Sequence, residues 1–236
     1  MFTGWALCRN WMNSIGVNQG IVESRAGVTL AGGAPFGAAL LRLAMSHAPE
    51  IVAADGGADR LLRLGVEPRA VFGDFDSISA QAQARLQGRL FPVTEQESTD
   101  FDKALRHIAA PFVLGVGFQG ARLDHGLAVL NALTRHPDRR ALILGPQEVT
   151  FLAPPELELQ LPLGSRVSLF PMAPVQGDSE GLRWPIAGLH FTPDGRIGTS
   201  NMVSAPQVRL RFDAPAMLVI LPLRSLRAVL SGLGLR

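Results

Sequence analysis

Cysteine is nearly absent from this sequence: Cys8 is the only one among 236 residues. A lone cysteine excludes an internal disulfide, and the C-x-x-C spacing of structural zinc sites does not occur in the chain. Both absences favour a reducing compartment, so we expect a cytoplasmic protein.

An excess of one charge is also lacking. The 22 basic and 20 acidic residues leave a formal charge of +2, too little to hold nucleic acid or an anionic membrane without specific contacts. Residues 1–20 have no basic segment ahead of an apolar run, and Arg9 interrupts that run, so neither a signal peptide nor a membrane span is indicated. We therefore expect no nucleic acid and no membrane among its partners. Because a strand-like pattern begins only near Gly27, we expect residues 1–26 to be an adaptable N-terminal extension.

The chain does have the pattern of a folded α/β protein. Hydrophobic residues make up 47% and charged residues 18%, which is a globular balance. Between residues 27 and 144, short aliphatic runs alternate with helical patterns, as in parallel strands joined by helical crossovers. The expected strands are 28–30, 51–54, 70–72, 90–93, 112–116 and 141–144. Residues 27–147 are thus expected to form an α/β domain with an open, mainly parallel sheet and flanking helices.

One helix of this domain is expected at residues 124–135. Its apolar residues recur at helical spacing, and His136-Pro137 follows it: Leu123, Leu127, Leu130 and Thr134. We expect this stripe to face the core and Asn131 to face away from it.

From residue 148 the pattern changes to alternating or apolar runs separated by Pro, Gly and Asp turns. These runs lie at 156–161, 166–170, 207–212 and 216–221. They predict a small antiparallel β-sandwich over residues 148–236, with a hairpin turn at Asp194-Gly195 and a short closing helix at 224–235. With no low-complexity linker between them, the two expected domains should pack closely.

Aspartate is concentrated in one part of the chain: seven of the eleven lie between residues 55 and 124. Asp55, Asp74 and Asp76 directly follow expected strands, and residues at the carboxyl ends of parallel strands line the ligand crevice of an open sheet. Carboxylates that converge repel one another unless a cation lies among them, which indicates a hard divalent ion such as Mg²⁺. Asp74 and Asp76 are two apart, so an extended segment points both to one side. The alternative is a turn in which Ser77 or Ser79 caps the next helix.

Two glycines follow Asp55, between an expected strand and an expected helix. Gly56 and Gly57 allow a close approach of the backbone to a ligand and present N–H groups to an anion. A tight strand-to-helix turn requires the same residues, so both interpretations stay open.

The segment from Ser98 to Lys103 has the pattern of a helix start, with Thr99 as the N-cap and Asp102 as its reciprocal partner. A structural role explains every residue in it. A functional role follows if Asp100 faces the crevice, where it completes a metal site or accepts a substrate's hydroxyl proton. Lys103, one turn along, would then reach a phosphate.

Residues 115–120 match the G-x-G-x-x-G fingerprint of dinucleotide-binding folds. We discount this match, because the next strand ends in Gly145-Pro146 rather than in the acid that would hold a ribose. Beside it, Arg122 can bind a phosphate through two N–H groups, and Asp124 lies where the next helix begins. His125 is left without a role. No G-x-x-x-x-G-K-[ST] loop occurs in the chain, which excludes a P-loop kinase.

Taken in order, six segments resemble the thiamine pyrophosphokinase family. They are 55–58, 73–78, 98–105, 117–125, 181–185 and 199–201, and the resemblance extends over about residues 27–223. It implies a thiamine diphosphokinase, an enzyme that transfers pyrophosphate from ATP to the hydroxyl of thiamine, giving thiamine diphosphate and AMP. It also implies Mg²⁺ as cofactor, an ATP-binding α/β domain, a thiamine-binding β-sandwich, and a homodimer with thiamine at the subunit interface.

The resemblance also implies roles for individual residues. Those implied in catalysis are Asp74, Asp76, Asp100, Lys103, Arg122 and Asp124, and the first three would hold the metal. Those implied in contacts with ATP or thiamine are Asp55, Gly56, Gly57, Thr99, Arg122, Trp184, Ser200 and Asn201. Trp184 would pack on the cationic thiamine ring, a ligand that suits an indole face, and Ser200 and Asn201 would hydrogen-bond the aminopyrimidine.

The sequence departs from the family at Glu95-Gln96-Glu97, where aspartate is common, and we assign no role there. Two other functions stay open. One is an NAD(P)-dependent oxidoreductase that uses Gly115 to Gly120, and the other is a thiamine- or nucleotide-binding sensor without turnover.

Overall fold

The computed structural model describes residues 22–93, 95, 97–120 and 122–235. Most of the expected N-terminal extension lies outside these residues. Its last part already belongs to the fold, because β1 (Val22–Glu23) pairs in parallel with β6 (Ile108–Ala109) and Val22 is buried. The strand pattern therefore begins before Gly27.

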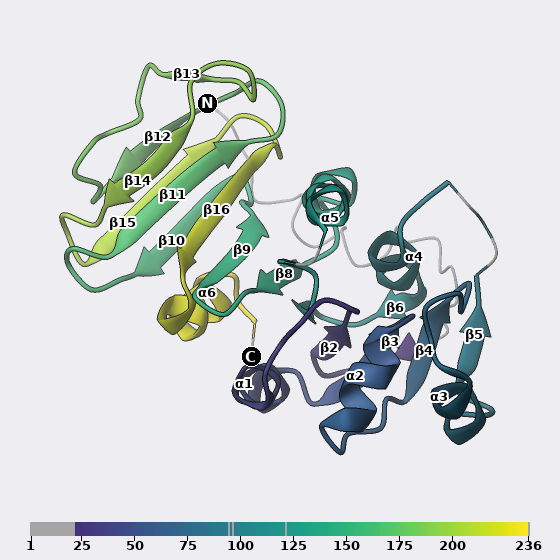
Figure 1. Ribbon diagram of the computed structural model, residues 1–236. Helices are drawn as coiled ribbons and strands as arrows, with labels where there is room; N and C mark the ends of the chain where they lie inside the picture. Colours follow the sequence, from purple (N-terminus) through teal and green to yellow (C-terminus); the bar gives the residue numbers. More distant parts are fainter. Residues whose placement is uncertain (1–21, 94, 96, 121, 236) are drawn as a thin grey trace.

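The six strands expected in the first half are all present. They are β2 (Val28–Ala31), β3 (Glu50–Ala54), β4 (Ala70–Gly73), β5 (Leu90–Pro92), β7 (Val113–Val116) and β8 (Ala141–Leu144). Their order in the sheet is β8-β7-β2-β3-β4-β5, and every neighbouring pair is parallel. The expected open α/β fold is confirmed (Figure 1).

Helices cover both faces of this parallel sheet. They are α1 (Ala38–His47), α2 (Gly57–Arg63), α3 (Ala80–Arg85), α4 (Asp100–His107) and α5 (Leu123–Arg135). Alternate strand residues point to opposite faces: Ala31 and Ala53 share a core with α1, α2 and α3, whereas Leu30 and Val52 share one with α4 and α5. Within the described residues, no helix combines the length and the apolar character needed to cross a membrane.

The expected helix at 124–135 is present as α5, but the expected core-facing stripe is only partly right, because Leu130 packs against the core and Leu123 and Leu127 do not. Its buried residues are Val129, Ala132 and Leu133, while Leu123 is 80% and Leu127 is 55% exposed. Both sets recur at helical spacing, so the pattern alone did not identify the buried one. Asn131 is exposed, as expected.

The second half of the chain is a β-sandwich, as expected. Four of its strands extend the large sheet: β9 (Glu148–Leu152), β11 (Arg166–Pro171), β14 (Gly198–Met202) and β16 (Met217–Pro222). Four others form a separate antiparallel sheet: β10 (Glu156–Gln160), β12 (Val175–Glu180), β13 (His190–Phe191) and β15 (Gln207–Phe212). Side chains of both sheets, among them Val167 and Val208, share one core. The short closing helix is α6 (Leu226–Gly232), after a 3₁₀ turn, η2 (Leu223–Ser225).

One detail of this half differs from the sequence expectation. The turn at Asp194-Gly195 is present, with Gly195 N donating to Thr192 O over 3.1 Å. It does not form a hairpin, because β13 and β14 on either side of it belong to different sheets.

A continuous sheet joins the two halves. β8 pairs antiparallel with β9, so the ten strands run in the order β14-β11-β16-β9-β8-β7-β2-β3-β4-β5. The expected domain boundary at residues 147 and 148 falls between these two paired strands and stays a prediction.

The register of the parallel strands places the site. Ala31 is level with both Ala53 and Val116, and Ala54 is level with Phe72. The segments that follow β2, β3, β4 and β7 therefore leave the sheet at the same edge, where open α/β folds bind their ligands.

Candidate active site

Asp55 follows β3 at this edge and is the most deeply buried carboxylate of the site, only 2% exposed. Its backbone is in the left-handed region, with φ 43°, and its N–H donates to Phe72 O over 2.8 Å. Among the described residues, neither of its carboxylate oxygens has a hydrogen-bond partner. Burial, with the nearby charges of Asp100 and Asp76, raises the pKa of Asp55 to about 6.

Asp74 and Asp76 meet Asp55 from the loop after β4. Carboxylate oxygens of the three residues lie within 4.8 Å of one another. The sequence suggested an extended segment between Asp74 and Asp76. The structure differs, because Phe75 has φ 64°, in the left-handed region. The same loop ends in a helix cap, because Ser79 Oγ accepts from Ala82 N. Asp74 and Asp76 at the start of this loop can therefore hold a metal ion while Ser79 at its end caps the next helix, so the two interpretations do not exclude each other.

Lys103 lies between two carboxylates of the site. Its Nζ is 3.7 Å from Asp74 Oδ2 and 3.8 Å from Asp100 Oδ1, and the residue is 2% exposed. Burial raises the pKa of Asp100. For Asp74 burial acts in the same direction, but the Asp76 N–H and the Lys103 ammonium outweigh it and lower the pKa. Of the 22 basic residues in the chain, Lys103 is the only lysine.

Thr99 precedes α4 as its N-cap, but the reciprocal cap expected from Asp102 is not formed. Asp102 is buried and instead lies 2.5 Å from His136 Nε2, with the guanidinium groups of Arg106 and Arg135 3.6 and 3.7 Å away. Asp102 thus connects α4 to the end of α5, since two guanidinium groups and an imidazole there offer it more than one N-cap amide would.

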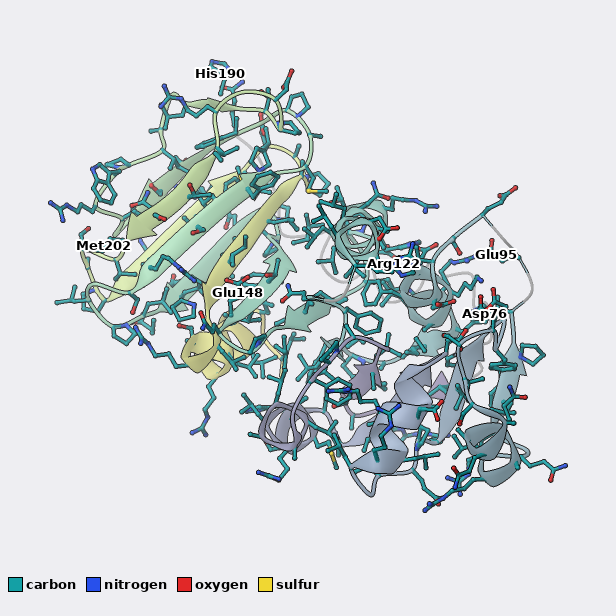
Figure 2. The ribbon with its side chains drawn as sticks, viewed as in Figure 1. Asp76, Glu95, Arg122, Glu148, His190 and Met202 are labelled. Carbon is teal, nitrogen blue, oxygen red and sulfur yellow. The ribbon has the colours of Figure 1, made fainter. Side chains whose placement is uncertain are left out.

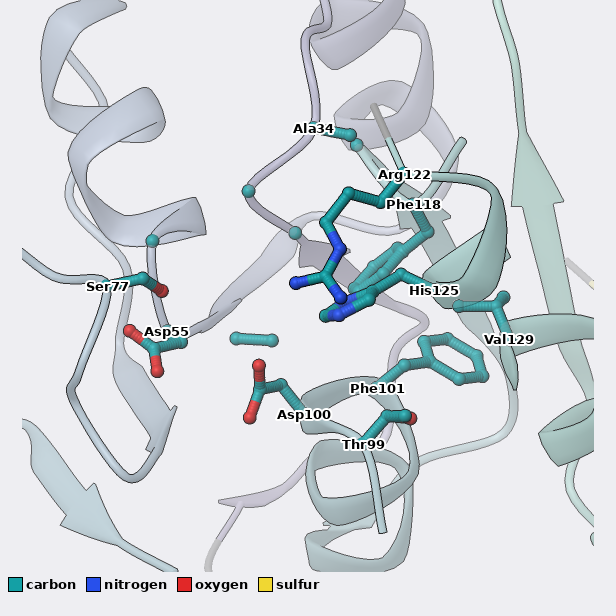
Figure 3. A pocket seen from close by; sticks show the side chains of 15 residues that line it. Ala34, Asp55, Ser77, Thr99, Asp100, Phe101, Phe118, Arg122, His125 and Val129 are labelled. Atoms are coloured by element: carbon teal, nitrogen blue, oxygen red, sulfur yellow. The ribbon is translucent and has the colours of Figure 1, made fainter. Parts of the chain in front are cut away.

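A cavity of about 260 Å³ opens beside the acidic cluster (Figure 3). Asp55 and Asp100 line its acidic side, and Phe101, Phe118 and Val129 line its apolar side. Arg122 and His125 reach it from the start of α5, as Figure 3 shows. The remaining lining residues are Gly32, Gly33, Ala34, Ala54, Gly56, Ser77, Thr99 and Gly117. The cavity therefore offers an acidic wall, a basic group and exposed backbone to one ligand.

The two glycines after Asp55 have different reasons to be glycine. A Cβ on Gly57 would lie 2.1 Å from Ala31 O, so packing alone requires glycine there. Gly56 lines the cavity, and a Cβ on it would meet Ser77 at 3.3 Å. Only Gly56 is therefore placed for contact with a ligand.

Arg122 and Asp124 form an exposed ion pair before and within the first turn of α5. Arg122 Nε donates to Asp124 Oδ1 over 3.1 Å, and Nη2 donates to Oδ2 over 2.5 Å. The Arg122 hydrogen bond lowers the pKa of Asp124 to about 2. Asp124 does not line the cavity, whereas Arg122 does.

A second group of expected site residues lies in the sandwich. Trp184 is 52% exposed, and the Arg183 guanidinium carbon lies 5.0 Å from the centroid of its ring. Ser200 is exposed, and Asn201 is buried beside it. Trp184 and Asn201 are in direct contact through hydrogen bonds.

Two family models match the chain, and both describe thiamin pyrophosphokinase. The model of the catalytic domain matches residues 41–144, and that of the vitamin B1 binding domain matches residues 155–217. The chain belongs to the thiamin pyrophosphokinase family.

Members of this family in plants are similar over most of the chain. Thiamine pyrophosphokinase 1 of Arabidopsis thaliana is 26% identical over 213 residues, which cover 75% of this chain and 80% of the relative. Thiamine pyrophosphokinase 2 of Oryza sativa subsp. japonica is 27% identical over 210 residues, 74% of this chain and 79% of the relative.

Solved structures of thiamin pyrophosphokinases share the fold. The enzyme from Candida albicans superposes with a TM-score of 0.72 at 15% identity, covering 85% of this chain and 93% of the other. The yeast enzyme gives a TM-score of 0.71 at 16% identity, with 86% and 88% covered. At these identities the likeness concerns the fold alone.

The fingerprint at residues 115–120 does not form a dinucleotide site in this thiamin pyrophosphokinase fold. In that motif the last glycine opens the following helix, whereas α5 begins at Leu123, after Gly120. A Cβ on Gly117 would lie 2.5 Å from Gly32 O, so close packing of two loops explains this glycine. The oxidoreductase alternative is not supported.

The donor set at the acidic cluster fits a divalent cation. It contains only carboxylate oxygens, the ligands that Mg²⁺ prefers. The buried oxygens of Asp55 have no donor within the described part of the chain, a state that costs free energy unless a cation compensates it. Asp100 is held 3.8 Å from Lys103 and lies outside the group of three, so Asp74 and Asp76 are the better placed of the expected metal residues.

Sequence reasoning missed several lining residues of the cavity. Gly32 and Gly33 follow β2 at the carboxyl edge, and the rule that selected Asp55 and Asp74 also applies to them. Nothing in the sequence marked Phe118 as a lining residue of the cavity, because an aromatic residue after a strand is as common in a hydrophobic core as in a binding site. It stacks edge-on against Phe101, with centroids 4.8 Å apart, and forms the apolar wall.

Proposed function

We propose that this protein transfers the pyrophosphoryl group of ATP to the hydroxyl of thiamine, giving thiamine diphosphate and AMP. The observation that carries the proposal is the aspartate cluster, in which oxygens of Asp55, Asp74 and Asp76 approach within 4.8 Å. It lies at the ligand-binding edge of the sheet and inside the span matched by the catalytic-domain model. The relatives that carry the thiamine pyrophosphokinase name span both halves of the chain.

In this proposal Asp74 and Asp76 hold Mg²⁺, and Asp100 joins them from α4. The bound ion supplies positive charge to the phosphate oxygens on which negative charge accumulates. Asp55 lies beside the pair and adds its buried carboxylate to the same wall.

The other residues bind and orient the substrates. The thiamine hydroxyl oxygen attacks the β-phosphorus, and the bond from this phosphorus to the oxygen bridging to the α-phosphate breaks. AMP leaves with that oxygen, and the hydroxyl proton is released to solvent. Arg122 exchanges its exposed partner Asp124 for a phosphate, which costs little because such surface pairs contribute about 0–1 kcal/mol. Gly56 and Thr99 bring the backbone close to the ATP phosphates at the cavity wall.

In this proposal Lys103 does not contact a phosphate, as the sequence suggested, but acts on the neighbouring carboxylates. Its Nζ is buried between Asp74 and Asp100, so its charge favours the ionised form of both carboxylates and holds α4 against the loop after β4. The carboxylates are then already in place when the metal arrives.

Thiamine binding requires a second copy of the chain. In this proposal Trp184 packs on the thiamine ring, with Ser200 at the aminopyrimidine. Figure 2 shows Met202, the neighbour of Asn201, at the opposite end of the molecule from Asp76. One chain therefore cannot bring its own sandwich residues and its own acidic cluster to a single thiamine. We include in the proposal a homodimer in which the sandwich of one copy faces the cavity of the other.

The exposed leucines of α5 support this arrangement. Leu123 and Leu127 are apolar and exposed and, with Arg122, line a second hollow on α5, and neighbouring exposed apolar side chains of this kind are typical of contact surfaces. The Leu127→Glu variant should sediment as a monomer and lose thiamine turnover, while a dimeric and active variant would remove α5 from the interface.

The experiment that tests the function is an incubation with ATP, Mg²⁺ and thiamine. We expect AMP and thiamine diphosphate in equal amounts, with no product when EDTA is present. Thiamine binding without AMP would identify a sensor, and tight NADH binding without a requirement for Mg²⁺ would identify an oxidoreductase. Either result would contradict the proposal. The cytoplasmic location expected from the single cysteine is part of the same proposal.

A further inference from the structure

Strand β14 is irregular at the residues expected to bind thiamine. It pairs with β11 through Val167↔Asn201 and Leu169↔Gly198, so that one residue of β11, Ser168, faces two of β14. Within this bulge Ser200 has φ 62°, in the left-handed region that a non-glycine residue rarely adopts. Its N–H donates to the buried Ser168 Oγ over 3.0 Å. Bulges of this type redirect side chains and occur next to functional sites.

The bulge turns the Asn201 side chain inward, where it binds the backbone of Trp184. Asn201 Nδ2 donates to Trp184 O over 2.7 Å, and Asn201 Oδ1 accepts from Trp184 N over 3.3 Å. The same oxygen accepts from Met202 N over 2.8 Å. An asparagine side chain has two donor and two acceptor positions, so three of the four are occupied by these bonds. The residue is only 7% exposed, which leaves little of it for a ligand.

We infer that Asn201 is a positioning residue: it fixes Trp184 for contact with the ring of the substrate and does not bind the substrate itself. This inference rests on the proposed function and changes the role that the family resemblance implies for Asn201. The aminopyrimidine is then recognised by Ser200, the exposed neighbour in the bulge, and Asn201 acts on binding only through the indole.

The position of Trp184 matters because Arg183 lies over one face of its exposed ring. The Arg183 guanidinium lies over the ring, 5.0 Å from the centroid, and Arg183 N donates to Met202 O over 2.8 Å. A cationic ring must therefore stack on the face away from Arg183, since two cations repel on one indole. If the clamp is lost, the backbone at Trp184 can move, and the ring face away from Arg183 no longer has a fixed direction.

Tryptophan fluorescence tests the clamp without any substrate. Trp184 is the third tryptophan of the chain, after Trp5 and Trp11, so a Trp5→Phe/Trp11→Phe background makes it the only emitter. In this background Asn201→Ala should lower the fluorescence anisotropy of the indole and raise its quenching by acrylamide. Asn201→Asp keeps the acceptor but loses the donor to Trp184 O, and it should give a smaller change of the same sign. Unchanged anisotropy in both variants would overturn the inference.

Ser165→Ala provides the matched control. Ser165 is a buried polar residue of the same sandwich, and within the described residues its hydroxyl has no hydrogen-bond partner. Its substitution should change neither the anisotropy nor the melting temperature. A fall in anisotropy for Asn201→Ala but not for Ser165→Ala assigns the effect to the clamp.

Kinetics distinguish positioning from direct binding. Asn201→Ala should raise the KM for thiamine on the order of tenfold, the size expected from about 1.4 kcal/mol of lost contact, with the KM for ATP unchanged. Because Asn201 acts through Trp184, adding Asn201→Ala to Trp184→Ala should raise the KM no further. Effects that multiply in the double variant would mean that Asn201 touches the substrate and would overturn the inference. If the wild-type protein forms no thiamine diphosphate, the proposed function fails, while the fluorescence result still decides whether Asn201 holds Trp184.

Discussion

The parallel half of the chain and the four-stranded sheet of the sandwich differ in where they place charged residues. In the parallel half, Asp55, Asp102 and Lys103 are each only 2% exposed. In the sandwich, the arginines of β15 pair with acids on β10 and β12, and all these side chains are between 45% and 82% exposed: Arg209 with Glu158 and Glu180, and Arg211 with Glu156 and Asp178. The parallel half thus encloses three of its charged residues, whereas the charges of this four-stranded sheet remain in water.

This difference separates charges that need a partner or a ligand from charges that form a solvated surface. A buried charge costs free energy and persists where a partner or a ligand compensates it. An exposed cross-strand pair contributes little and can be lost with little effect. The enclosed charges and the acidic cluster of the parallel half should therefore respond strongly to single substitutions, and the exposed pairs of the four-stranded sheet should not.

The largest effect is expected for Asp76→Asn. Removing one carboxylate from the cluster weakens the metal site, so turnover should fall at least about 1000-fold, the range found when a group that stabilises transition-state charge is removed. Formation of AMP, measured with saturating thiamine, reports the change. Asp138→Asn, at an exposed aspartate outside the cluster, should retain full activity. A near-normal rate in Asp76→Asn would refute the metal assignment.

Lys103→Met should destabilise the metal-free protein by about 3 kcal/mol, since it leaves carboxylates at the buried site without their cation. Urea unfolding in EDTA measures this loss, and Mg²⁺ should restore part of it. Lys103→Arg should also be destabilising, because a planar guanidinium does not fit the enclosed space of an ammonium. Equal stability of wild type and both variants in EDTA would show that Lys103 is not the counter-charge of the cluster.

Asp55 should make the stability of the metal-free protein depend on pH. Its pKa is raised from 3.8 to about 6 in the folded state, so between these values the unfolded chain releases a proton that the folded chain keeps. Stability should therefore fall as the pH rises from about 4 to about 6, by about 2–3 kcal/mol.

Asp55→Asn should abolish this decline. Above pH 6 in EDTA the variant should melt at a higher temperature than the wild type, and near pH 3.5 the two should agree. A higher melting temperature at pH 3.5 alone would assign the effect to another group. With Mg²⁺ present, the advantage of the variant should disappear.

The smallest effect is expected for Arg209→Gln on the outer sheet of the sandwich. Arg209 Nε lies 3.2 Å from Glu158 Oε2, and Nη1 lies 3.3 Å from Glu180 Oε2, but these groups are exposed and screened by salt. The free energy of unfolding should change by less than about 1 kcal/mol. A loss as large as that of Lys103→Met would end the distinction between the two halves.

The sequence predicted the parallel half well because its signals are local. Apolar runs identified all six strands, and the rule that ligands lie beyond the carboxyl ends of parallel strands was enough to select Asp55, Asp74 and Asp76. The approach of their oxygens follows from the register of β3 and β4, which those runs determine.

Features that depend on distant residues were not predictable from local pattern. β12 contains Gln176, Asp178 and Glu180 and has no clear apolar alternation. It is a strand because it pairs with β15, and its own sequence gives no sign of this pairing. Asp102 resembled a helix cap, but its partner His136 is 34 residues away. The exposed leucines of α5 gave the same period as the buried face, and period alone does not distinguish a core from a contact surface.

The central claim is that the aspartates of the cluster hold one divalent cation between them. Its most direct test is a Mn²⁺ titration of the EDTA-treated protein in the presence of a non-hydrolysable ATP analogue, followed by electron paramagnetic resonance. The wild type should bind Mn²⁺ saturably, Mg²⁺ should displace it, and Asp76→Asn should lose most of this binding. Equal Mn²⁺ binding by wild type and Asp76→Asn would contradict the account, because the aspartates at the edge of the sheet would then hold no common metal ion.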